Sequence, residues 1–299
     1  MKQVSFIGLG AMGAPMAENI IKAGFRLKVY DLSKERCEIL ISRGGMSAND
    51  LRDAGSGADI VFTMLPATQE VNSVLEGIDG ILHHMTSGGI VVDMSTVSPS
   101  GTDSIAQACK KYGVRFMDAP VGRQVIHAIK GESLFMVGCD DEPTFLDVKP
   151  YLNAMGTTIV RCGGIGMGTR MKVVNNMQIL TIAEVTAEAI LLSEKLGLKL
   201  DLVKQVNADT TATNGQMQFT FPTKVFSGDI TPGFTIELAH KDMALAMQAA
   251  KELKLQLPSC ESAEGVYQRV KKSSLGKKDF SALLEYWCEL NKIETPRIN

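Results

Sequence analysis

The sequence predicts an α/β domain followed by an all-α domain, and three observations lead to this expectation. Short strand patterns alternate with helical patterns through the first half of the chain. A glycine-rich turn at 8–13 separates the first strand pattern from the first helical pattern. Beyond residue 167 almost no strand signal remains. At 299 residues the chain is long enough for two hydrophobic cores, and we expect domains at 1–164 and 165–299.

The strand patterns of the first half are short and apolar, which is typical of strands that helices cover on both faces. They lie at 4–7, 27–30, 59–65, 90–94, 114–118, 133–137 and 157–160. Helical patterns lie between them at 15–21, 34–43, 70–75, 101–112 and 142–155. The alternation predicts a mostly parallel, doubly wound sheet whose ligands bind beyond the carboxyl ends of the strands. The residues that fall at such ends are Leu65, Pro66, Ser95, Thr96 and 120–123.

The second half has helical patterns only. The longest covers 169–196 and ends before Gly197, a residue suited to the left-handed cap of a helix. Shorter helical patterns lie at 201–208, 236–253, 260–271 and 280–290. We expect this all-α domain to take part in substrate binding and in oligomerisation.

The composition excludes several classes of protein. A net charge of −2 and a pI near 6.1 give no reason to expect nucleic acid or an anionic membrane as a partner. The six cysteines are scattered and have no metal-ligand spacing, which favours reduced thiols and no metal site. The N-terminus lacks the pattern of a secretory signal, and no apolar run reaches membrane-spanning length. We therefore expect a cytoplasmic protein.

The turn at 8–13 matches the pattern G-x-G-x-x-G between a strand and a helix. In a Rossmann-type fold Gly8 would make the tight turn, Gly10 would let a pyrophosphate approach the backbone, and Gly13 would allow close helix packing. The phosphates would then lie at the helix N-terminus, against the backbone of Ala11 and Met12.

Asp31 ends the second strand pattern, 18 residues after Gly13. This is close to the spacing of an acid that accepts hydrogen bonds from the adenosine ribose and repels a 2′-phosphate. We therefore expect NAD as cofactor, while the nearby cations Lys34 and Arg36 leave NADP possible. The alternative is that Asp31 only caps the helix that follows it.

Lys172 and Asn176 are four residues apart in the long helical pattern and therefore share one helix face, with Asn175 close to it. Apolar neighbours would lower the pKa of Lys172 and make it a proton donor near neutral pH. The alternative is a surface lysine beside two structural asparagines.

Arg123 follows Gly122 after a predicted strand. Glycine would let the backbone approach a ligand, and the guanidinium is suited to a carboxylate, phosphate or sulfonate. The alternative is an arginine on a solvated loop.

With these residues the chain resembles the β-hydroxyacid dehydrogenases, which include 3-hydroxyisobutyrate dehydrogenase and tartronate semialdehyde reductase. The resemblance covers nearly the whole chain and rests on the segments 6–16, 93–96, 118–121, 172–176 and 240–242. It implies that Lys172 is the catalytic acid/base and that Asn176 supports it. It also implies that Thr96 and Lys241 border the nicotinamide and the substrate, that Leu65 and Pro66 lie along the cofactor, and that the chain forms homodimers or homotetramers.

The chain departs from the common pattern of this family after Val121, where Ser-Gly-Gly is replaced by Gly122, Arg123 and Gln124. This version resembles the branch that contains 3-sulfolactaldehyde reductase, which is also associated with succinic semialdehyde. In that branch Asn175 and Gln178 would face the anionic end of the substrate. Gly122 and Ser95 would border the substrate as well.

These observations predict an NAD-dependent oxidoreductase that reduces a small anionic aldehyde to its hydroxy acid, or catalyses the reverse oxidation. The expected substrate is 3-sulfolactaldehyde, with 2,3-dihydroxypropane-1-sulfonate as product. Arg123 would bind the substrate anion and Lys172 would donate the proton. Succinic semialdehyde, tartronate semialdehyde and 3-hydroxyisobutyrate remain as alternative substrates. A non-catalytic nucleotide-sensing module is the alternative from a different class.

Overall fold

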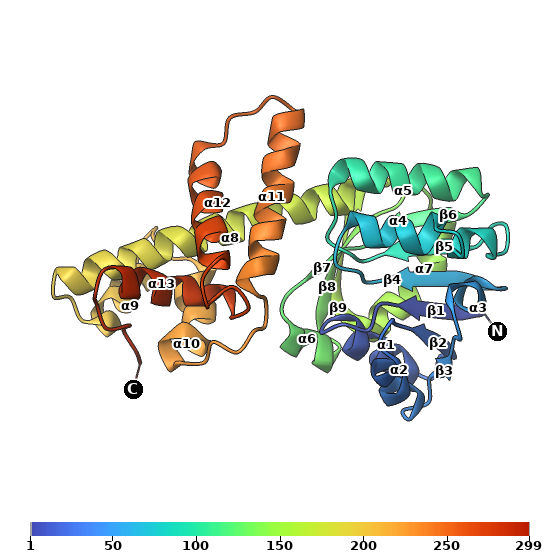
Figure 1. Cartoon of the computed structure of the whole chain (residues 1–299), viewed down its shortest axis with the longest axis horizontal. Coiled ribbons are helices and arrows are strands. Elements are labelled where there is room, and N and C mark those ends of the chain that lie inside the picture. Colours follow the sequence, from blue (N-terminus) through green and yellow to red (C-terminus); the bar gives the residue numbers. More distant parts are fainter. Residues whose placement is uncertain (1, 299) are drawn as a thin grey trace. The chain divides into compact units, whose positions relative to one another are not determined.

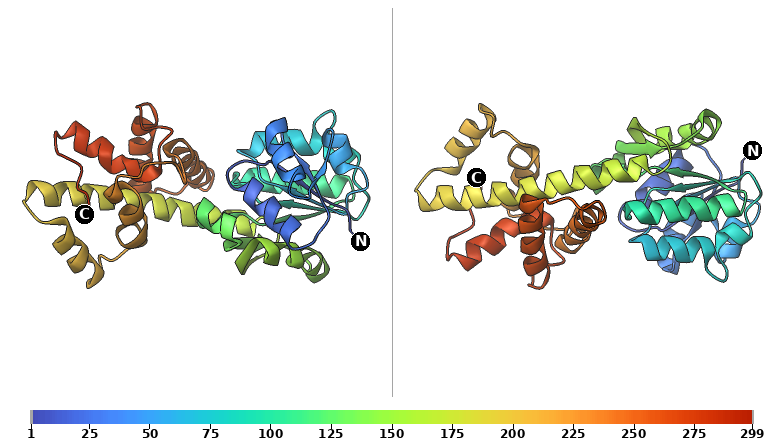
Figure 2. Two further views of the ribbon diagram at one scale, coloured as in Figure 1. Left: turned by 90° about the horizontal axis from the view of Figure 1, so that it is seen from below. Right: turned by 90° about the horizontal axis from the view of Figure 1, so that it is seen from above.

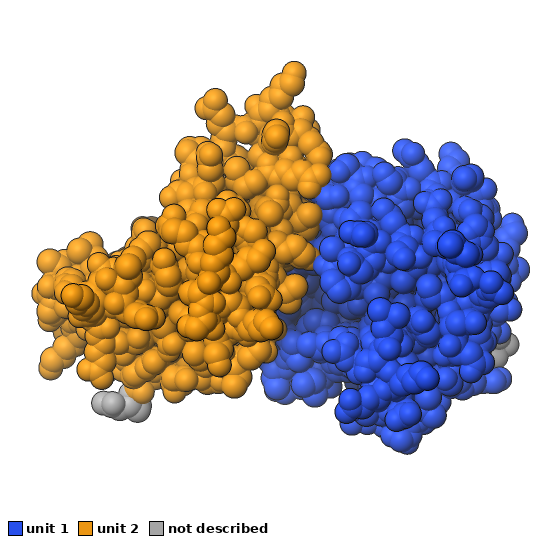
Figure 3. All heavy atoms as spheres, in the orientation of Figure 1, with its two compact units in different colours: residues 1–172 blue, residues 173–299 orange. Residues whose placement is uncertain are grey.

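The computed structural model describes residues 2–298 of the chain, which form two compact units (Figure 1). Figure 3 colours these units, residues 1–172 and residues 173–299. The division falls between Lys172 and Val173, within the long helix α8 (Met167–Lys195), whereas the sequence suggested a boundary at 164 and 165. The predicted fold class, a doubly wound α/β domain followed by an all-α domain, is confirmed.

The first unit is built on one sheet with the strand order β3-β2-β1-β4-β5-β6-β8-β7, and β9 pairs with β8. The central strands β1 to β6 run parallel, β8 is antiparallel to β6 and β7, and β8 and β9 are parallel to each other. The strands are β1 (Val4–Ile7), β2 (Leu27–Tyr30), β3 (Met46–Ser47), β4 (Ile60–Thr63), β5 (Ile90–Asp93), β6 (Arg115–Asp118), β7 (Val121–Gly122), β8 (Ser133–Gly138) and β9 (Gly156–Gly163).

Helices cover both faces of this sheet, because successive strand residues point to opposite faces and both sets are apolar. Phe6 and Phe62 face a core shared with the helices α1 and α7, whereas Val61 and Val91 face a second core shared with α4 and α5. Figures 1 and 2 show this layering. The helices of this unit are α1 (Gly13–Lys22), α2 (Lys34–Ile41), α3 (Leu51–Gly55), α4 (Thr68–Glu76), the short η1 (Ile81–His83), α5 (Pro99–Lys111), α6 (Val125–Lys130) and α7 (Glu142–Met155).

Five short elements of this unit have no counterpart in the sequence-based prediction: β3, α3, η1, β7 and α6. The strands β3 and β7 contain two residues each, which is too short for any periodic pattern. The helix α6 begins at a capping box in which the Gln124 N–H donates to His127 Nδ1 at 3.4 Å. His127 is therefore part of a helix start in this structure.

The second unit is helical and has its own core, which is centred on Phe221, Tyr267 and Leu284. Beyond α8 its elements are α9 (Leu200–Ala208), η2 (Gln216–Thr220), α10 (Phe221–Thr223), η3 (Val225–Ser227), α11 (Ile236–Glu252), α12 (Pro258–Lys271), η4 (Phe280–Ala282) and α13 (Leu283–Leu290). Apart from one isolated bridge between Thr235 and Asp279, residues 173–298 contain no strand pairing.

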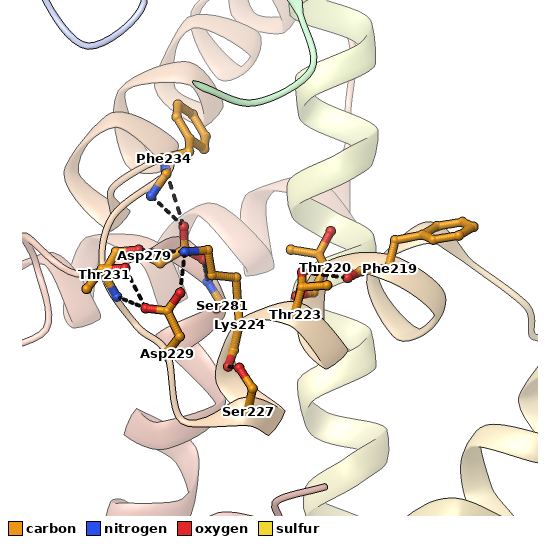
Figure 4. A network of polar contacts seen from close by, with 11 residues as sticks. Phe219, Thr220, Thr223, Lys224, Ser227, Asp229, Thr231, Phe234, Asp279 and Ser281 are labelled. Atoms are coloured by element: carbon orange, nitrogen blue, oxygen red, sulfur yellow. Dashed lines mark hydrogen bonds and ion pairs between the residues drawn. The ribbon is translucent and has the colours of Figure 1, made fainter. Parts of the chain in front are cut away.

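A polar network holds the loop that leads into α11 (Figure 4). Asp279 is fully buried, and its carboxylate accepts backbone N–H groups from Gly233 at 3.1 Å, Phe234 at 3.3 Å and Ser281 at 3.1 Å. The ammonium of Lys224 contacts Asp229 at 2.9 Å in the same loop. A buried carboxylate that satisfies three backbone donors fixes the loop on the core of this unit.

Candidate functional site

The glycine-rich turn after β1 has different surroundings at each of its three glycines. Gly8 has a φ of +96°, and a Cβ placed there would lie 2.3 Å from the carbonyl oxygen of Met64. A Cβ on Gly13 would lie 1.9 Å from the carbonyl oxygen of Gly8. At Gly10 no atom lies within 4 Å of such a Cβ. Packing therefore requires glycine at two positions, while the third leaves open space above the backbone.

The helix α1 starts at this turn without a side chain that caps it. Met12 is the N-cap residue, no side chain bonds to the first turn, and that turn contains no acid. Uncapped N–H groups and the positive end of the helix dipole favour an anion at this place. Ala11, which precedes the cap, is exposed. The turn therefore fits the pyrophosphate of a dinucleotide.

Asp31 lies beside the same turn at the end of β2. Its carboxylate accepts the N–H of Leu9 at 2.7 Å and the N–H of Ser33 at 2.8 Å, and the guanidinium of Arg36 lies 3.7 Å away. The cap of α2 is Ser33, whose hydroxyl accepts from Arg36 N. Asp31 is therefore not the helix cap itself, and it links β2 to the glycine-rich turn.

The loops that follow β4 and β5 are joined by Ser95. Its hydroxyl accepts the N–H of Leu65 at 2.9 Å, and its own N–H donates to the buried Asp93 at 3.1 Å. Thr96 follows as a half-buried residue, and Pro66 follows Leu65 as an exposed one. These four residues thus gather at the carboxyl ends of two neighbouring parallel strands.

Lys172 lies on the first turns of α8, and its ammonium donates to the carbonyl oxygen of Val121 at 2.7 Å. The side chain is half-buried. Val121 belongs to β7, two residues before Arg123. The structure therefore brings the Lys172 amine to the segment that carries Gly122 and Arg123, although these residues are about fifty positions apart in the sequence.

Arg123 has a left-handed backbone, with a φ of 72°, and an exposed side chain. Its guanidinium donates to the carbonyl oxygen of Glu132 and to the hydroxyls of Thr157 at 3.1 Å and Thr158 at 3.3 Å. All of these acceptors are neutral. Within residues 2–298, no carboxylate forms an ion pair with Arg123, in contrast to Arg170, which is paired with Asp103 at 2.8 Å.

The remaining candidates belong to the second unit. Asn176 is buried and donates to Asp242 at 2.6 Å, while its own amide oxygen accepts from Asn175 at 3.3 Å. The Lys241 ammonium lies 3.1 Å from the other carboxylate oxygen of Asp242. Asn175, Asn176 and Lys241 are thus linked through Asp242. Gln178 is exposed on α8.

Two acids that organise these groups, Asp118 and Asp242, had no role predicted from the sequence. Asp118 accepts the N–H groups of Gly166 and Thr169 at the start of α8. Both acids lie in segments that carried the family resemblance, and Asp118 ends an apolar strand pattern. An acid at the end of a buried strand must find donors inside the protein, and this signal could have indicated its importance.

Two general features of residues 2–298 bear on the class of site. No group of three or more His, Cys, Asp or Glu side chains in this range is gathered so that it could hold a metal ion. In the same range, no helix combines the length and apolarity that crossing a bilayer requires.

Comparison with known protein families identifies both halves of the chain. Residues 3–164 match the family described as the NAD binding domain of 6-phosphogluconate dehydrogenase. Residues 166–287 match the family described as the NAD-binding domain of NADP-dependent 3-hydroxyisobutyrate dehydrogenase. The chain belongs to the β-hydroxyacid dehydrogenase family. As a member of this family it is an NAD(P)-dependent oxidoreductase that acts on CH–OH groups, and the prediction of an enzyme is confirmed.

Relatives within the family are similar over nearly their whole length. The 3-sulfolactaldehyde reductase of Escherichia coli is 36% identical over 95% of this chain and 95% of its own. The 2-hydroxy-3-oxopropionate reductase of the same organism is 34% identical over 95% of this chain and 96% of its own. The solved structure of Mycobacterium tuberculosis 3-hydroxyisobutyrate dehydrogenase with L-serine superposes with a TM-score of 0.89, at 30% identity, and covers 96% of this chain and 99% of that chain.

Proposed function

We propose that the protein catalyses the NAD-dependent reduction of 3-sulfolactaldehyde to 2,3-dihydroxypropane-1-sulfonate, or the reverse oxidation. The observation that carries this proposal concerns two cationic side chains, one that contacts the segment 121–123 and one that belongs to it. The Lys172 amine contacts Val121 at 2.7 Å, and within residues 2–298 the guanidinium of Arg123, two residues further on, bonds only to neutral groups. Lys172 would donate its proton to the aldehyde oxygen, and Arg123 would bind the anionic group of the substrate.

The cofactor fits the first unit because the open space at Gly10 and the uncapped start of α1 suit a pyrophosphate. Gly8 and Gly13 keep this turn in place. We assign to Asp31 the role of accepting hydrogen bonds from the adenosine ribose, which favours NAD over NADP. When bound, the nicotinamide supplies or accepts the hydride.

In the proposed mechanism Lys172 stabilises the negative charge that develops on the aldehyde oxygen and then donates a proton to it. In the oxidative direction the neutral amine of Lys172 takes the proton from the hydroxyl. Asn176, one turn further along α8, is assigned the role of orienting this amine, and Asp242 holds the Asn176 amide at 2.6 Å. Leu65, Pro66, Thr96 and Lys241 are assigned to the cofactor.

Arg123 is assigned to the substrate anion, together with Gly122, Ser95, Asn175 and Gln178. The neutral contacts of its guanidinium support this role, because a charge without a carboxylate partner remains available to an anion. Binding requires the guanidinium to exchange these contacts for the substrate. A sulfonate offers three oxygens to the planar donor group, which suits an arginine better than a serine hydroxyl.

A second candidate substrate is a small aldehyde that carries a carboxylate, such as succinic semialdehyde or tartronate semialdehyde, or the 3-hydroxyisobutyrate pair. The similarity to 2-hydroxy-3-oxopropionate reductase favours this class. Its carboxylate would form a bidentate pair with the same guanidinium. Family membership decides against the remaining alternative, a nucleotide-sensing module without catalysis.

The proposal is tested by measuring kcat/KM for a panel of sulfonate and carboxylate aldehydes with NADH and with NADPH. We expect the highest value for 3-sulfolactaldehyde with NADH. Arg123→Gln should raise the KM of the preferred substrate by roughly 10- to 100-fold, the range expected when a charge-assisted hydrogen bond is lost. The control Arg52→Gln alters another exposed arginine of the first unit, which is paired with Asp79, and should leave KM unchanged. A preference for carboxylate aldehydes would select the second candidate.

We also propose that the chain forms homodimers or homotetramers. The second unit exposes large apolar side chains on α8, just after it and on α9, among them Val185, Leu192, Leu196, Leu202 and Val206. Exposed large apolar side chains are typical of association sites where they form a patch. Light scattering coupled to size-exclusion chromatography measures the mass in solution, and a monomer over a wide concentration range would contradict this assembly.

A further inference from the structure

We propose that Asp118 is a positioning residue for catalysis, because it fixes the start of α8 on the segment 118–123 and thereby places the Lys172 amine. This inference rests on the proposed role of Lys172 as proton donor. Asp118 itself touches neither the substrate nor the cofactor in this account, and it acts through the helix that carries Lys172.

The contacts of Asp118 join two segments that are far apart in the sequence. Its two carboxylate oxygens accept the N–H of Gly166 at 2.6 Å and the N–H of Thr169 at 2.7 Å. Gly166 directly precedes α8 and Thr169 lies in its first turn, where backbone N–H groups lack partners within the helix. A carboxylate can accept two such bonds at once, and these short, charge-assisted bonds define where the helix begins.

The surroundings leave Asp118 no freedom to move. Its side chain is fully buried. A Cβ placed on Gly138 would lie 2.3 Å from one carboxylate oxygen. A Cβ placed on Gly168 would lie 2.1 Å from the Met136 carbonyl oxygen and 2.9 Å from the other carboxylate oxygen. Both glycines therefore pack closely around this carboxylate. Such close packing fixes the position of α8 relative to the end of β6.

A second tie connects the same two segments. Lys172 lies three residues after Thr169 on α8, and Val121 lies three residues after Asp118 on the sheet segment. The Asp118–Thr169 and Lys172–Val121 hydrogen bonds therefore connect the helix at two successive places to the segment that ends in Arg123. A shift of α8 along this segment would move the Lys172 amine away from Val121, and a displacement of about 1 Å is enough to reduce turnover strongly.

Burial of this carboxylate has an energetic cost that a simpler helix cap would avoid. Burial raises the pKa of Asp118 to about 6, while the hydrogen bonds from Gly166 and Thr169 act in the opposite direction. The charged or titratable groups that face Asp118 are the Arg170 guanidinium, paired with Asp103, and the Cys162 thiol on β9. Serine, threonine or asparagine caps helices without a buried charge. We explain the carboxylate by its two equivalent oxygens, which accept the N–H groups of Gly166 and Thr169 at the same time.

The chain offers a matched control for this role. Asp279 is also fully buried, and it accepts three backbone N–H groups (Figure 4). It holds a loop of the second unit and has no bond to the segment 118–123 or to the start of α8. Asp118→Asn and Asp279→Asn both leave a backbone donor facing an amide NH2 group, so both should lower the melting temperature.

The experiment compares kcat, the aldehyde KM and the dissociation constant of NADH in these two variants. We expect Asp118→Asn to lower kcat by roughly 10- to 100-fold while NADH binding changes by less than about twofold. Asp279→Asn should keep the kcat of the folded fraction. Asp118→Ser, whose side chain is smaller and has no NH2 group, should show the same loss of kcat. This variant replaces Asp118→Asn in the comparison if Asp118→Asn does not fold.

A double variant separates this inference from the proposed function. If Lys172→Ala abolishes most turnover and Asp118 acts through Lys172, adding Asp118→Asn should not reduce the residual rate further. Full turnover in Lys172→Ala would overturn the proposed function. A normal kcat in the folded fraction of Asp118→Asn or Asp118→Ser would overturn only the positioning role, as would equal losses in Asp118→Asn and Asp279→Asn.

Discussion

The glycine-rich turn allows cofactor binding and folding to be separated by two alanine substitutions. A Cβ on Gly10 meets no atom within 4 Å, so Gly10→Ala introduces no clash into the free protein. We expect its unfolding free energy to stay within about 0.5 kcal/mol of the wild type, because alanine fits this backbone without strain. The methyl group would occupy the space assigned to the pyrophosphate, so the affinity for NADH should fall by roughly 10- to 100-fold, or about 1.4–2.7 kcal/mol.

Gly13→Ala, in contrast, should lower the free energy of unfolding. Its Cβ would lie 1.9 Å from the Gly8 carbonyl oxygen, and such contacts essentially never fall below 3.0 Å. The start of α1 and the Gly8 carbonyl oxygen must therefore move apart by at least 1.1 Å, the difference between these two distances. Overpacking of this kind typically costs about 1–3 kcal/mol.

The assay combines urea unfolding without cofactor and fluorescence titration with NADH for the wild type and the two variants. The expected pattern is normal stability with weak binding for Gly10→Ala, and reduced stability for Gly13→Ala. Wild-type affinity for NADH in Gly10→Ala would refute the placement of the pyrophosphate at this turn. A large loss of stability in Gly10→Ala would refute the argument from open space.

Two further predictions concern single acids. Asp31→Asn should shift the ratio of NADPH to NADH affinity by about tenfold toward NADPH, because the substitution removes the charge that repels a 2′-phosphate; an unchanged ratio in competitive titrations would contradict the assignment of Asp31. Burial raises the pKa of Glu184 from its ordinary value of 4.5 to about 7. The contribution of this group to the free energy of unfolding is therefore fully present below pH 4.5 and is lost as the pH rises through 7. The wild type should therefore lose up to about 3 kcal/mol between pH 5 and pH 8 that Glu184→Gln does not lose, since the Trp287 N–H can still donate to the amide oxygen. Urea unfolding at both pH values measures this difference, and parallel pH profiles would contradict it.

The strands and helices that bury a periodic apolar face could be predicted from the sequence. The strand at 27–30 and the helix at 142–155 have the predicted bounds, because each has a clear pattern between turn residues. The elements β7 and α6 could not be predicted, since β7 depends on pairing with β8 and α6 depends on a local capping box. No periodic signal in the sequence indicates that β8 runs antiparallel to β6. This direction depends on the short connection through β7 and α6.

At the candidate site, residue type and position in the sequence indicated the glycine-rich turn, Lys172 and Arg123 as candidates, and their roles remain proposals. It could not give the contacts of these side chains, because those depend on packing between distant segments. The bond from Lys172 to Val121 joins two segments whose separation in space is set by the whole sheet. The hydrogen bonds of Arg123 to Thr157 and Thr158 depend on the pairing of β8 with β9. The organising role of Asp118 has the same origin.

The proposed mechanism depends on proton donation by Lys172, and a single-turnover experiment measures this dependence. Lys172→Ala, preloaded with NADH and mixed with the preferred aldehyde, is compared with the wild type by following the absorbance of the reduced nicotinamide. We expect normal NADH binding and a rate of NADH consumption lower by at least about a hundredfold, in the range that a positioned general acid contributes. NADH consumption at the wild-type rate in Lys172→Ala would contradict the role of Lys172 as proton donor.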